Sequence, residues 1–253
     1  MQEIKRGSFV ERDKNGPERV FKNIVILTGA GISAESGVAT FRDNDGLWEN
    51  HKIEDVATPE AFARDPVLVQ SFYNARRAHL HTVKPNAAHK ALARLQKELL
   101  GDVTIVTQNV DDLHERGGAD AVMHMHGELI KVRCRACATV HDWTIDCTAE
   151  SQCPTCERLG TLRPHIVWFG ELPFHMEEIA EKLQACDLFI SVGTSGNVYP
   201  AAGFVSNVQE TGKAHTIEVN LEPSEGASLF AERRQGKAGE LLPNLVQELL
   251  NMG

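Results

Sequence analysis

The chain has 253 residues, 42% hydrophobic and 24% charged, values typical of a folded globular protein, so disordered and collagen-like classes are excluded. A formal net charge of −9 disfavours general nucleic-acid binding, because that affinity comes from neutralising phosphates. No apolar run approaches the ~20 residues of a membrane helix, and residues 1–19 lack the apolar core of a secretory signal. We expect a cytoplasmic protein with no nucleic-acid or membrane partner. The sequence leaves the oligomeric state open, with a monomer as the expectation.

Four short apolar runs are predicted to be strands. They are rich in β-branched residues and show no polar–apolar alternation, which is typical of parallel strands covered on both faces. In chain order they are Asn23–Thr28, Val103–Thr107, Asp187–Val192 and His215–Val219.

Helical patterns separate these runs. Asn86 can cap a helix whose leucines recur every three or four residues until Gly101 stops it. Tyr199–Thr211 and Leu241–Asn251 are predicted as further amphipathic helices, the second with Pro243 near its first turn. Strands that alternate with helices indicate an α/β fold with a Rossmann-like, doubly wound parallel sheet.

Two segments do not fit this alternation. The first is rich in helical patterns and the second holds a cysteine cluster, so we assign both to a smaller helical and zinc-ribbon domain formed by two insertions. The predicted boundaries are 46–82 and 128–164 for the small domain, 22–45, 83–127 and 165–253 for the sheet domain, and 1–21 for an N-terminal extension.

Polar or glycine residues follow each predicted strand at once. The four sequences are GAGIS after Thr28, QNVDD after Thr107, GTS after Val192 and NLE after Val219. Doubly wound sheets bind ligands beyond the carboxyl ends of their strands, and loops held by rigid strands commonly carry function. We therefore expect one ligand site at these four ends.

The cysteines Cys134, Cys137, Cys153 and Cys156 have the spacing C-x2-C-x15-C-x2-C. Two pairs of thiolates can converge on one tetrahedral ion and leave no open position for water, which predicts a structural zinc. Two disulfides are the alternative, disfavoured in a reducing cytoplasm, and the sequence leaves iron open. The other two cysteines are expected to be small buried hydrophobes.

The segment Gly29–Ala34 matches G-x-G-x-x-G/A directly after a strand. Glycines there allow a tight turn whose amides can face a pyrophosphate, although many glycine turns bind nothing. An ordinary dehydrogenase would also have an acidic residue about 20 residues further on, at the end of the next strand. That residue is missing, so the pattern predicts dinucleotide binding without hydride transfer.

Taken together, the motifs resemble the sirtuins, a family of NAD-dependent protein-lysine deacylases. The match runs from about residue 22 to residue 250 and includes Gly29-Ala30-Gly31-Ile32-Ser33, Phe41-Arg42, Gln108-Asn109-x-Asp111, His126-Gly127, the four cysteines, Gly193-Thr194-Ser195 and Asn220. The chain is most similar to the bacterial desuccinylase-like (class III) members, because Tyr73-x-x-Arg76 is present. Ala39 stands where many relatives have proline before the Phe-Arg pair.

The resemblance implies how NAD would be held. The glycine loop and Ser33 would hold the pyrophosphate, the loops after the third and fourth strands the adenosine, and the QNVDD loop the nicotinamide ribose and carboxamide. Phe41 would shield the reacting ribose carbon from water and Arg42 would position phosphate. The implied cofactor-binding residues are Gly29, Ala30, Gly31, Ile32, Ser33, Phe41, Arg42, Trp48, Gln108, Asn109, Asp111, Gly193, Thr194, Ser195, Asn220, Leu221, Glu222 and Ala238.

The resemblance also implies the reaction. The acyl-lysine oxygen attacks the ribose carbon and displaces nicotinamide, after which His126 acts as general base on the ribose hydroxyls. The products are deacylated lysine and 2′-O-acyl-ADP-ribose. An imidazole with an ordinary pKa of about 6.5 is mostly neutral at cytoplasmic pH and suits this role. His124 lies on the same face if the segment is extended, and we assign it a supporting role.

Tyr73 and Arg76 lie on one face of a predicted helix, where a guanidinium and a phenol could bind a carboxylate. This suits lysine acylated with a dicarboxylic acid such as succinate, and Ala57 would leave space for it. Spacing alone does not choose between Arg76 and Arg77; the family motif chooses Arg76. A merely solvated helical face is the alternative. We expect both deacetylase and desuccinylase activity.

The substrate is expected to be an acylated-lysine protein or peptide bound in an extended form. The resemblance places Val167, Phe169, Gly170 and Val198 against it, although a plain buried strand and loop would explain these residues equally well from sequence alone. Two other functions are the alternatives: a protein ADP-ribosyltransferase that uses the same fold, and a zinc-ribbon module that only binds peptide or nucleic acid. His126 with the Tyr73 and Arg76 pair disfavours the first, and the acidic charge disfavours the second.

Overall fold

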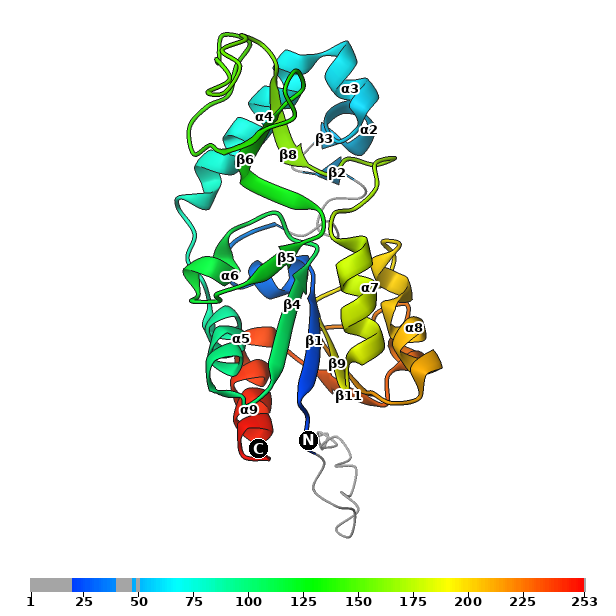
Figure 1. Ribbon diagram of the computed structural model, residues 1–253. Helices are drawn as coiled ribbons and strands as arrows, with labels where there is room; N and C mark the ends of the chain where they lie inside the picture. The colour runs from blue at the N-terminus through cyan, green and yellow to red at the C-terminus, as the bar shows by residue number, and fades with distance from the viewer. Residues whose placement is uncertain (1–19, 40–46, 49–50, 253) are drawn as a thin grey trace, which may run out of the picture.

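Six parallel strands form the sheet of the larger lobe in the computed structural model, which describes residues 20–39, 47–48 and 51–252, with 47–48 as backbone only. Its strand order is β11-β10-β9-β1-β4-β5 (Figure 1). The strands are β1 (Asn23–Thr28), β4 (Asp102–Thr107), β5 (Val122–His124), β9 (Leu188–Val192), β10 (His215–Asn220) and β11 (Glu232–Gln235). All four predicted strands are confirmed, and the two edge strands, β5 and β11, were not predicted.

The register brings the carboxyl ends of the central strands level. Thr28 at the end of β1 lies beside Thr107 of β4 on one side and Val192 of β9 on the other. Val192 in turn pairs with Val219 of β10. The four loops that follow these strands therefore start from one edge of the sheet.

Helices cover both faces of the sheet (Figure 1). On β1, Ile24 and Ile26 join the apolar cluster beneath α5 (Ala87–Glu98) and α9 (Ala238–Leu250). Val25 and Leu27 point to the other face, beneath α7 (Met176–Ala185) and α8 (Phe204–Thr211). This confirms the doubly wound α/β architecture, since a strand covered on both faces needs no polar side. Two short helices, α1 (Ala30–Ala34) and α6 (Leu113–Arg116), follow β1 and β4.

The predicted helices form with shifted ends. Asn86 caps α5, and His89 completes a capping box by accepting from the Asn86 amide. The segment predicted over Tyr199–Thr211 begins with the 3-10 turn Ala201–Gly203 before α8. Helix α9 begins three residues earlier than predicted, so Pro243 lies inside it rather than near its start. None of the described helices is long and apolar enough to cross a membrane.

The smaller lobe is built from both inserted segments. Helices α2 (Ile53–Val56), α3 (Pro59–Arg64) and α4 (Pro66–Leu80) follow a hairpin of β2 (Leu47–Trp48) and β3 (His51–Lys52). They pack on an antiparallel sheet of β6 (Gly127–Cys134), β7 (Val140–Asp142) and β8 (Leu162–Ile166). One apolar cluster joins the helices to this sheet, with Phe62 and Phe72 against Leu129 and Trp168. The residue boundaries between the lobes stay a prediction.

The turns after β1 and β9 touch backbone to backbone. The amide of Gly31 donates to the carbonyl of Gly193 at 2.9 Å, and that of Gly29 to Val192 at 3.0 Å. A Cβ on Gly31 would lie 2.7 Å from the Cα of Gly193; one on Gly193, whose φ is +62°, would lie 2.5 Å from the Ile32 nitrogen. The glycines are thus required for the packing of the two loops, and the amides of Gly29 and Gly31 already donate to carbonyl oxygens of the protein.

Replacing Gly193 by alanine is expected to destabilise the protein far more than replacing Gly212. Both residues have a left-handed φ, +62° and +64°, which costs alanine about 1–2 kcal/mol. Gly212 has nothing within 4 Å of a Cβ, whereas Gly193 would collide with the α1 backbone. Urea denaturation of both variants measures the difference; equal losses of unfolding free energy would contradict the loop contact.

Candidate active site

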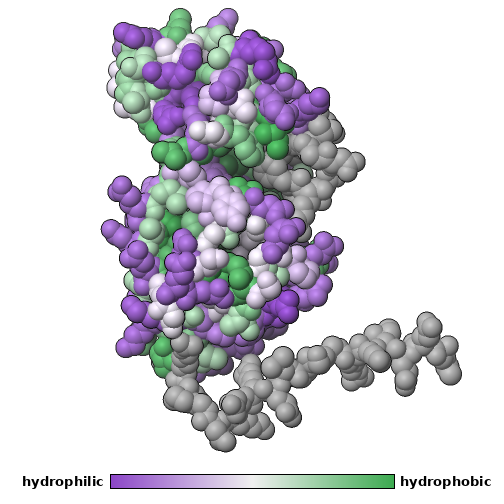
Figure 2. All heavy atoms as spheres, turned by 90° about the vertical axis from the view of Figure 1, so that its right-hand side faces the viewer, coloured by the Kyte–Doolittle hydropathy of each residue, from purple (hydrophilic) through white to green (hydrophobic). Residues whose placement is uncertain are grey.

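A cavity of about 1450 Å³ lies between the carboxyl edge of the sheet and the small lobe. Figure 2 shows the two lobes joined at a waist. Residues from all four strand-end loops line the cavity, together with the side of α4 and the chain after β8. The predicted cofactor residues on its wall are Gly29, Ala30, Gly31, Gln108, Asn109, Asp111, Gly193, Thr194, Ser195, Asn220, Leu221, Glu222 and Ala238.

Of the other five predicted cofactor residues, two have described side chains that lie away from the wall. Ile32 and Ser33 are fully buried in α1 beneath the cavity wall. Phe41 and Arg42 lie outside the described residues, and Trp48 belongs to β2 with its side chain outside the description. The proposed roles of all eighteen residues toward NAD stay predictions.

The Ser33 hydroxyl organises the polar floor of the site. It accepts from Asn109 Nδ2 at 3.1 Å and donates to Asp111 Oδ2 at 3.0 Å. The other Asp111 oxygen accepts from the amide of Leu113 at 3.1 Å. Burial raises the pKa of Asp111, and these hydrogen bonds act in the opposite direction. The two side chains that the resemblance assigns to nicotinamide and its ribose are thus fixed before any ligand enters.

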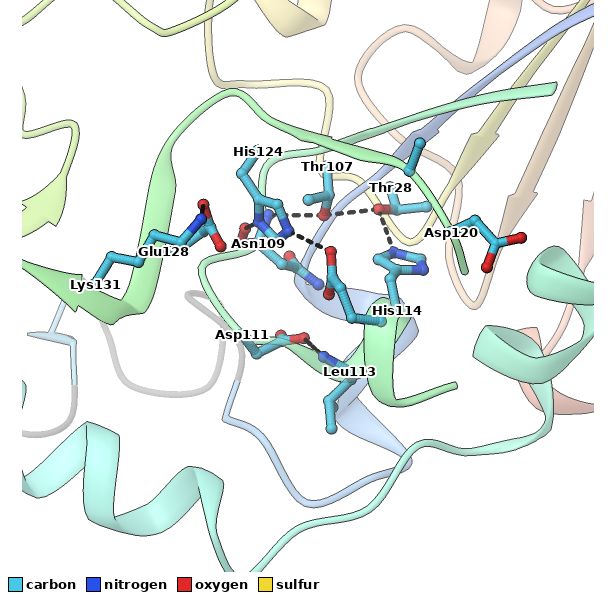
Figure 3. A network of polar contacts seen from close by, with 12 residues as sticks. Thr28, Thr107, Asn109, Asp111, Leu113, His114, Asp120, His124, Glu128 and Lys131 are labelled. Carbon is cyan, nitrogen blue, oxygen red and sulfur yellow. Dashed lines mark hydrogen bonds and ion pairs between the residues drawn. The ribbon is translucent and has the colours of Figure 1, made fainter. Parts of the chain in front are cut away.

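A second buried chain of contacts adjoins the first through Asn109. Thr28 and Thr107, level on neighbouring strands, share a hydrogen bond of 2.8 Å, and Thr28 also contacts His114 Nε2 at 3.0 Å (Figure 3). The hydroxyl of Thr107 accepts from the amide of Asn109 at 3.0 Å. Buried polar groups need such partners, and here they tie the strand ends to the loop above.

His126 lies in the turn between β5 and β6 and lines the cavity. Its Nδ1 is 3.0 Å from the carbonyl oxygen of Gln108, which can only accept. Nδ1 therefore carries the hydrogen, and Nε2 of the neutral ring is the nitrogen that can take a proton. Burial lowers the pKa of His126, and the Gln108 carbonyl offsets this in part. The geometry suits a general base.

His124 is buried two residues before it and does not line the cavity. Its Nε2 lies 2.9 Å from Glu115 Oε1 and its Nδ1 lies 3.3 Å from the carbonyl oxygen of Asn109. The two histidines thus contact consecutive residues of the same loop, in different protonation environments.

Tyr73, Arg76 and Ala57 meet at the small-lobe end of the cavity. Tyr73 is fully buried, and its hydroxyl accepts from the indole nitrogen of Trp168 at 2.9 Å. Burial raises the pKa of Tyr73, so the phenol stays neutral. The Arg76 guanidinium lies 5.6 Å from the ring centre of Phe72 on the cavity side of α4.

The neighbouring Arg77 points into the interior of the small lobe and not toward the cavity. Its side chain is buried and donates from Nε to the carbonyl of Leu129 at 2.9 Å and from a terminal nitrogen to Asn74 at 2.8 Å. Arg77 does not line the cavity, whereas Arg76 does. The structure thus separates two arginines that spacing alone left equivalent.

Trp168 is a site residue that the sequence analysis missed. Its ring lies under the Arg163 guanidinium, at 3.5 Å from the ring centre, and Arg163 binds both carboxylate oxygens of Glu171 at 2.7 and 3.0 Å. Its amide also donates to Glu171 at 2.9 Å. The only signal in the sequence is that Arg163 and Glu171, which can pair by charge, stand on either side of Trp168 in RPHIVWFGE.

The four predicted peptide contacts all line the cavity. Phe169 and Val198 are 50% and 40% exposed, large values for apolar side chains. The amide of Phe169 donates to the carbonyl of Ala57 at 3.0 Å and joins this segment to the small-lobe end of the cavity. His51, His79 and Lys237 also line the cavity and were not predicted, because no motif marks them.

The cysteines Cys134, Cys137, Cys153 and Cys156 place their sulfur atoms within 4.8 Å of one another. Two sulfur pairs are 3.7 Å apart, close to the separation of about 3.8 Å expected for sulfurs at 2.3 Å from a tetrahedral zinc. All four are free thiols, which disagrees with the disulfide alternative. Hydroxyls of Thr139 and Thr161 contact two of the sulfurs. This set fits a closed, structural zinc site.

Comparison with known proteins shows which family the chain is similar to. The profile of the Sir2 family, the sirtuins, matches residues 29–200, more than half of the chain. The chain belongs to the Sir2 family. A protein of Vibrio parahaemolyticus named NAD-dependent protein deacylase is 60% identical over 232 residues, which cover 91% of this chain and 96% of that protein. An Escherichia coli protein of the same name is 54% identical over 253 residues, covering 99% and 90%.

Solved Sir2 structures share the fold. A complex of a Sir2 homologue with NAD superposes with a TM-score of 0.83 at 37% identity, covering 92% of this chain and 91% of that one. A mutant homologue bound to 2′-O-acetyl ADP-ribose gives 0.82 at 37% identity, with coverage of 91% and 93%. At these identities the Sir2 fold accounts for nearly the whole chain.

Loss of one cluster cysteine is expected to remove the metal and lower the melting temperature. Cys153→Ser leaves three thiolates, which hold zinc less tightly, and β6 and β8 lose the link between their far ends. Metal analysis should find one zinc per parent chain and none in the variant. Cys186→Ala, outside the cluster, is the control and should retain zinc; iron in the parent, or full zinc in Cys153→Ser, would contradict the assignment.

Proposed function

We propose that this chain is an NAD-dependent protein-lysine deacylase that transfers the acyl group to ADP-ribose and releases nicotinamide, deacylated lysine and 2′-O-acyl-ADP-ribose. The observation that carries the proposal is the geometry of His126: its Nδ1 donates to the Gln108 carbonyl, and its ring lines the cavity. Relatives named NAD-dependent protein deacylase support it, as do Sir2 homologues bound to NAD and to 2′-O-acetyl ADP-ribose.

The residues present fit NAD. The cavity exceeds the ~300–1,000 Å³ of usual small-molecule sites, so it has room for a dinucleotide and an acyl-lysine together. Bound NAD would supply the ribose that accepts the acyl group, with nicotinamide as leaving group. Asn109 and Asp111 would face the nicotinamide half, and the loops after β9 and β10 the adenosine half.

Residues of this chain would transfer the proton, orient the polar side chains of the site and bind the peptide. His126 Nε2 would take a proton from a ribose hydroxyl, while the Gln108 carbonyl stabilises the imidazolium that forms. The Ser33 hydroxyl keeps the two polar side chains of the floor in place during the reaction. Phe169 and Val198 would hold an extended peptide at the mouth of the cavity.

The acyl end favours a dicarboxylic acyl group such as succinyl. Arg76 would bind the distal carboxylate, and Tyr73, a neutral phenol, would donate to the same group. Acetyl-lysine would bind without this ionic contact. One solved Sir2 complex contains a deacetylated p53 peptide, which supports peptide substrates for the family. A cytoplasmic location, a monomeric state and the absence of a nucleic-acid partner stay predictions from the sequence.

His126→Ala is expected to reduce deacylation by about 10²–10⁴-fold, the usual contribution of a positioned base. Because burial lowers the pKa of His126, the base form persists below pH 6.5, and kcat/KM of the parent should fall only as pH drops through that lowered pKa. An acid limb centred above pH 6.5 would disagree with this assignment.

The assay is mass spectrometry of a succinyl-lysine peptide, with and without NAD. Deacylated peptide plus O-acyl-ADP-ribose supports the proposal. A mass gain on the protein would indicate an ADP-ribosyltransferase, and deacylation without NAD would contradict the proposal outright.

Arg76→Met is expected to lower desuccinylation by one to two orders of magnitude and deacetylation by little, because a charge-assisted bidentate contact contributes about 1.5–3 kcal/mol. Arg64→Met is the matched control: Arg64 lies in α3 of the same lobe, does not line the cavity and pairs with Asp55. The ratio of kcat/KM for succinyl and acetyl peptides measures the effect. Equal losses on both peptides would refute the role of Arg76.

A further inference from the structure

Three consecutive carbonyls of the loop after β4 are each held by a donor from the chain around β5 and β6. The Gln108 carbonyl accepts from His126 Nδ1 at 3.0 Å, that of Asn109 from His124 Nδ1 at 3.3 Å, and that of Val110 from the amide of Leu129 at 2.8 Å. The backbone that presents Asn109 and Asp111 is therefore fixed from one side. Two of its three anchors are imidazole rings.

The contacts of His124 determine its protonation state. Nε2 lies 2.9 Å from the Glu115 carboxylate and Nδ1 faces the Asn109 carbonyl, and neither of these oxygens can donate. Both ring nitrogens must therefore carry hydrogens, which makes His124 an imidazolium. The His124 side chain is 6% exposed, and the side chain of Glu115 is 42% exposed. Figure 3 shows His124 beside Asn109 and next to Thr107 at the end of β4.

The charged and titratable groups around His124 come from three elements. Glu115 and His114 belong to α6, Asp111 to the loop, and Glu128 to β6, where it pairs with Lys131 at 2.8 Å. Burial alone would lower the pKa of His124, but the hydrogen bond and charge of Glu115, followed by Glu128 and the Asn109 carbonyl, raise it. His126 next to it has no such carboxylate, and its pKa is lowered.

We propose that His124, held as an imidazolium by Glu115, is a positioning residue that fixes the Asn109 carbonyl and thereby sets the NAD-binding loop. A neutral imidazole has one N–H and cannot serve both the carboxylate and the carbonyl. When His124 loses its charge, the closer carboxylate of Glu115 keeps the one remaining hydrogen on Nε2. Nδ1 then no longer donates to the Asn109 carbonyl, so the loop loses one of its three anchors and NAD binds less tightly. The inference rests on the proposed function only for the identity of this ligand.

The test is NAD affinity by calorimetry between pH 6 and pH 9. The parent should lose affinity as pH rises through the raised pKa of His124, and Glu115→Gln should move this loss to lower pH because the carboxylate charge is gone. At a pH between the two transitions, Kd for NAD should rise up to about tenfold per unit of displacement. Asp120→Asn, an exposed carboxylate near the network, is the control and should follow the parent.

His124→Gln separates positioning from mere packing. Glutamine keeps an amide donor for Asn109 and does not titrate, so NAD affinity should become independent of pH over the range in which the parent changes. A side chain that served only to fill space would leave the shape of the profile unchanged.

Nitrogen NMR of the histidine rings gives a readout that needs no turnover. At pH 7 the parent should show both His124 nitrogens protonated, identified by the signal that His124→Gln removes. A neutral His124 at pH 7, or matching NAD profiles for Glu115→Gln and Asp120→Asn, would overturn the inference. A parent that binds NAD with the expected profile but leaves acyl-lysine intact would contradict the proposed deacylase function and support the positioning role.

Discussion

The site depends on one backbone contact, the packing of Gly31 against Gly193. Parallel pairing in register ends β1 and β9 at the same level, and the chains beyond them approach so closely because neither Gly31 nor Gly193 has a Cβ at the contact. A wider separation would draw the β9 loop away from α1 and open the cavity wall between them. The glycine motif thus allows two strand-end turns to pack against each other, in addition to its usual interpretation as a phosphate-binding turn.

Buried polar groups around this contact have to be satisfied before a ligand can use the site. Thr28, Thr107 and Ser33 do this with hydroxyls, which can accept and donate at once and so connect groups that cannot bond to each other directly. Asn109 and Asp111 then keep fixed orientations under the cavity without the cost of an unpaired amide or carboxylate. A prepared arrangement of this kind lowers the reorganisation needed when NAD binds.

The sequence predicted the larger lobe better than the smaller one, for a physical reason. Strands such as Asn23–Thr28 are covered on both faces and are therefore continuously apolar, which is visible in isolation. β6 and β8 are antiparallel strands of mixed polarity whose residues are buried or half-buried without a regular alternation, and α4, which packs on them, lies about 50 residues or more earlier in the sequence. Likewise His126 was found through its motif, whereas Trp168 is recognised only once Tyr73 and Arg163 are seen on either side of it.

Helix α4 explains why a metal site so far from the chemistry matters to it. One face of the helix holds the zinc module: Gln70 donates to the carbonyl of Leu162 at 2.8 Å, and Asn74 exchanges hydrogen bonds with the backbone of Cys147 at 2.9 and 3.0 Å. Another face presents Tyr73 and Arg76 to the cavity. Since a helix is stiff over four turns, fixing the first face fixes the second, and the closed cysteine site orients the two side chains that are proposed to bind the acyl group.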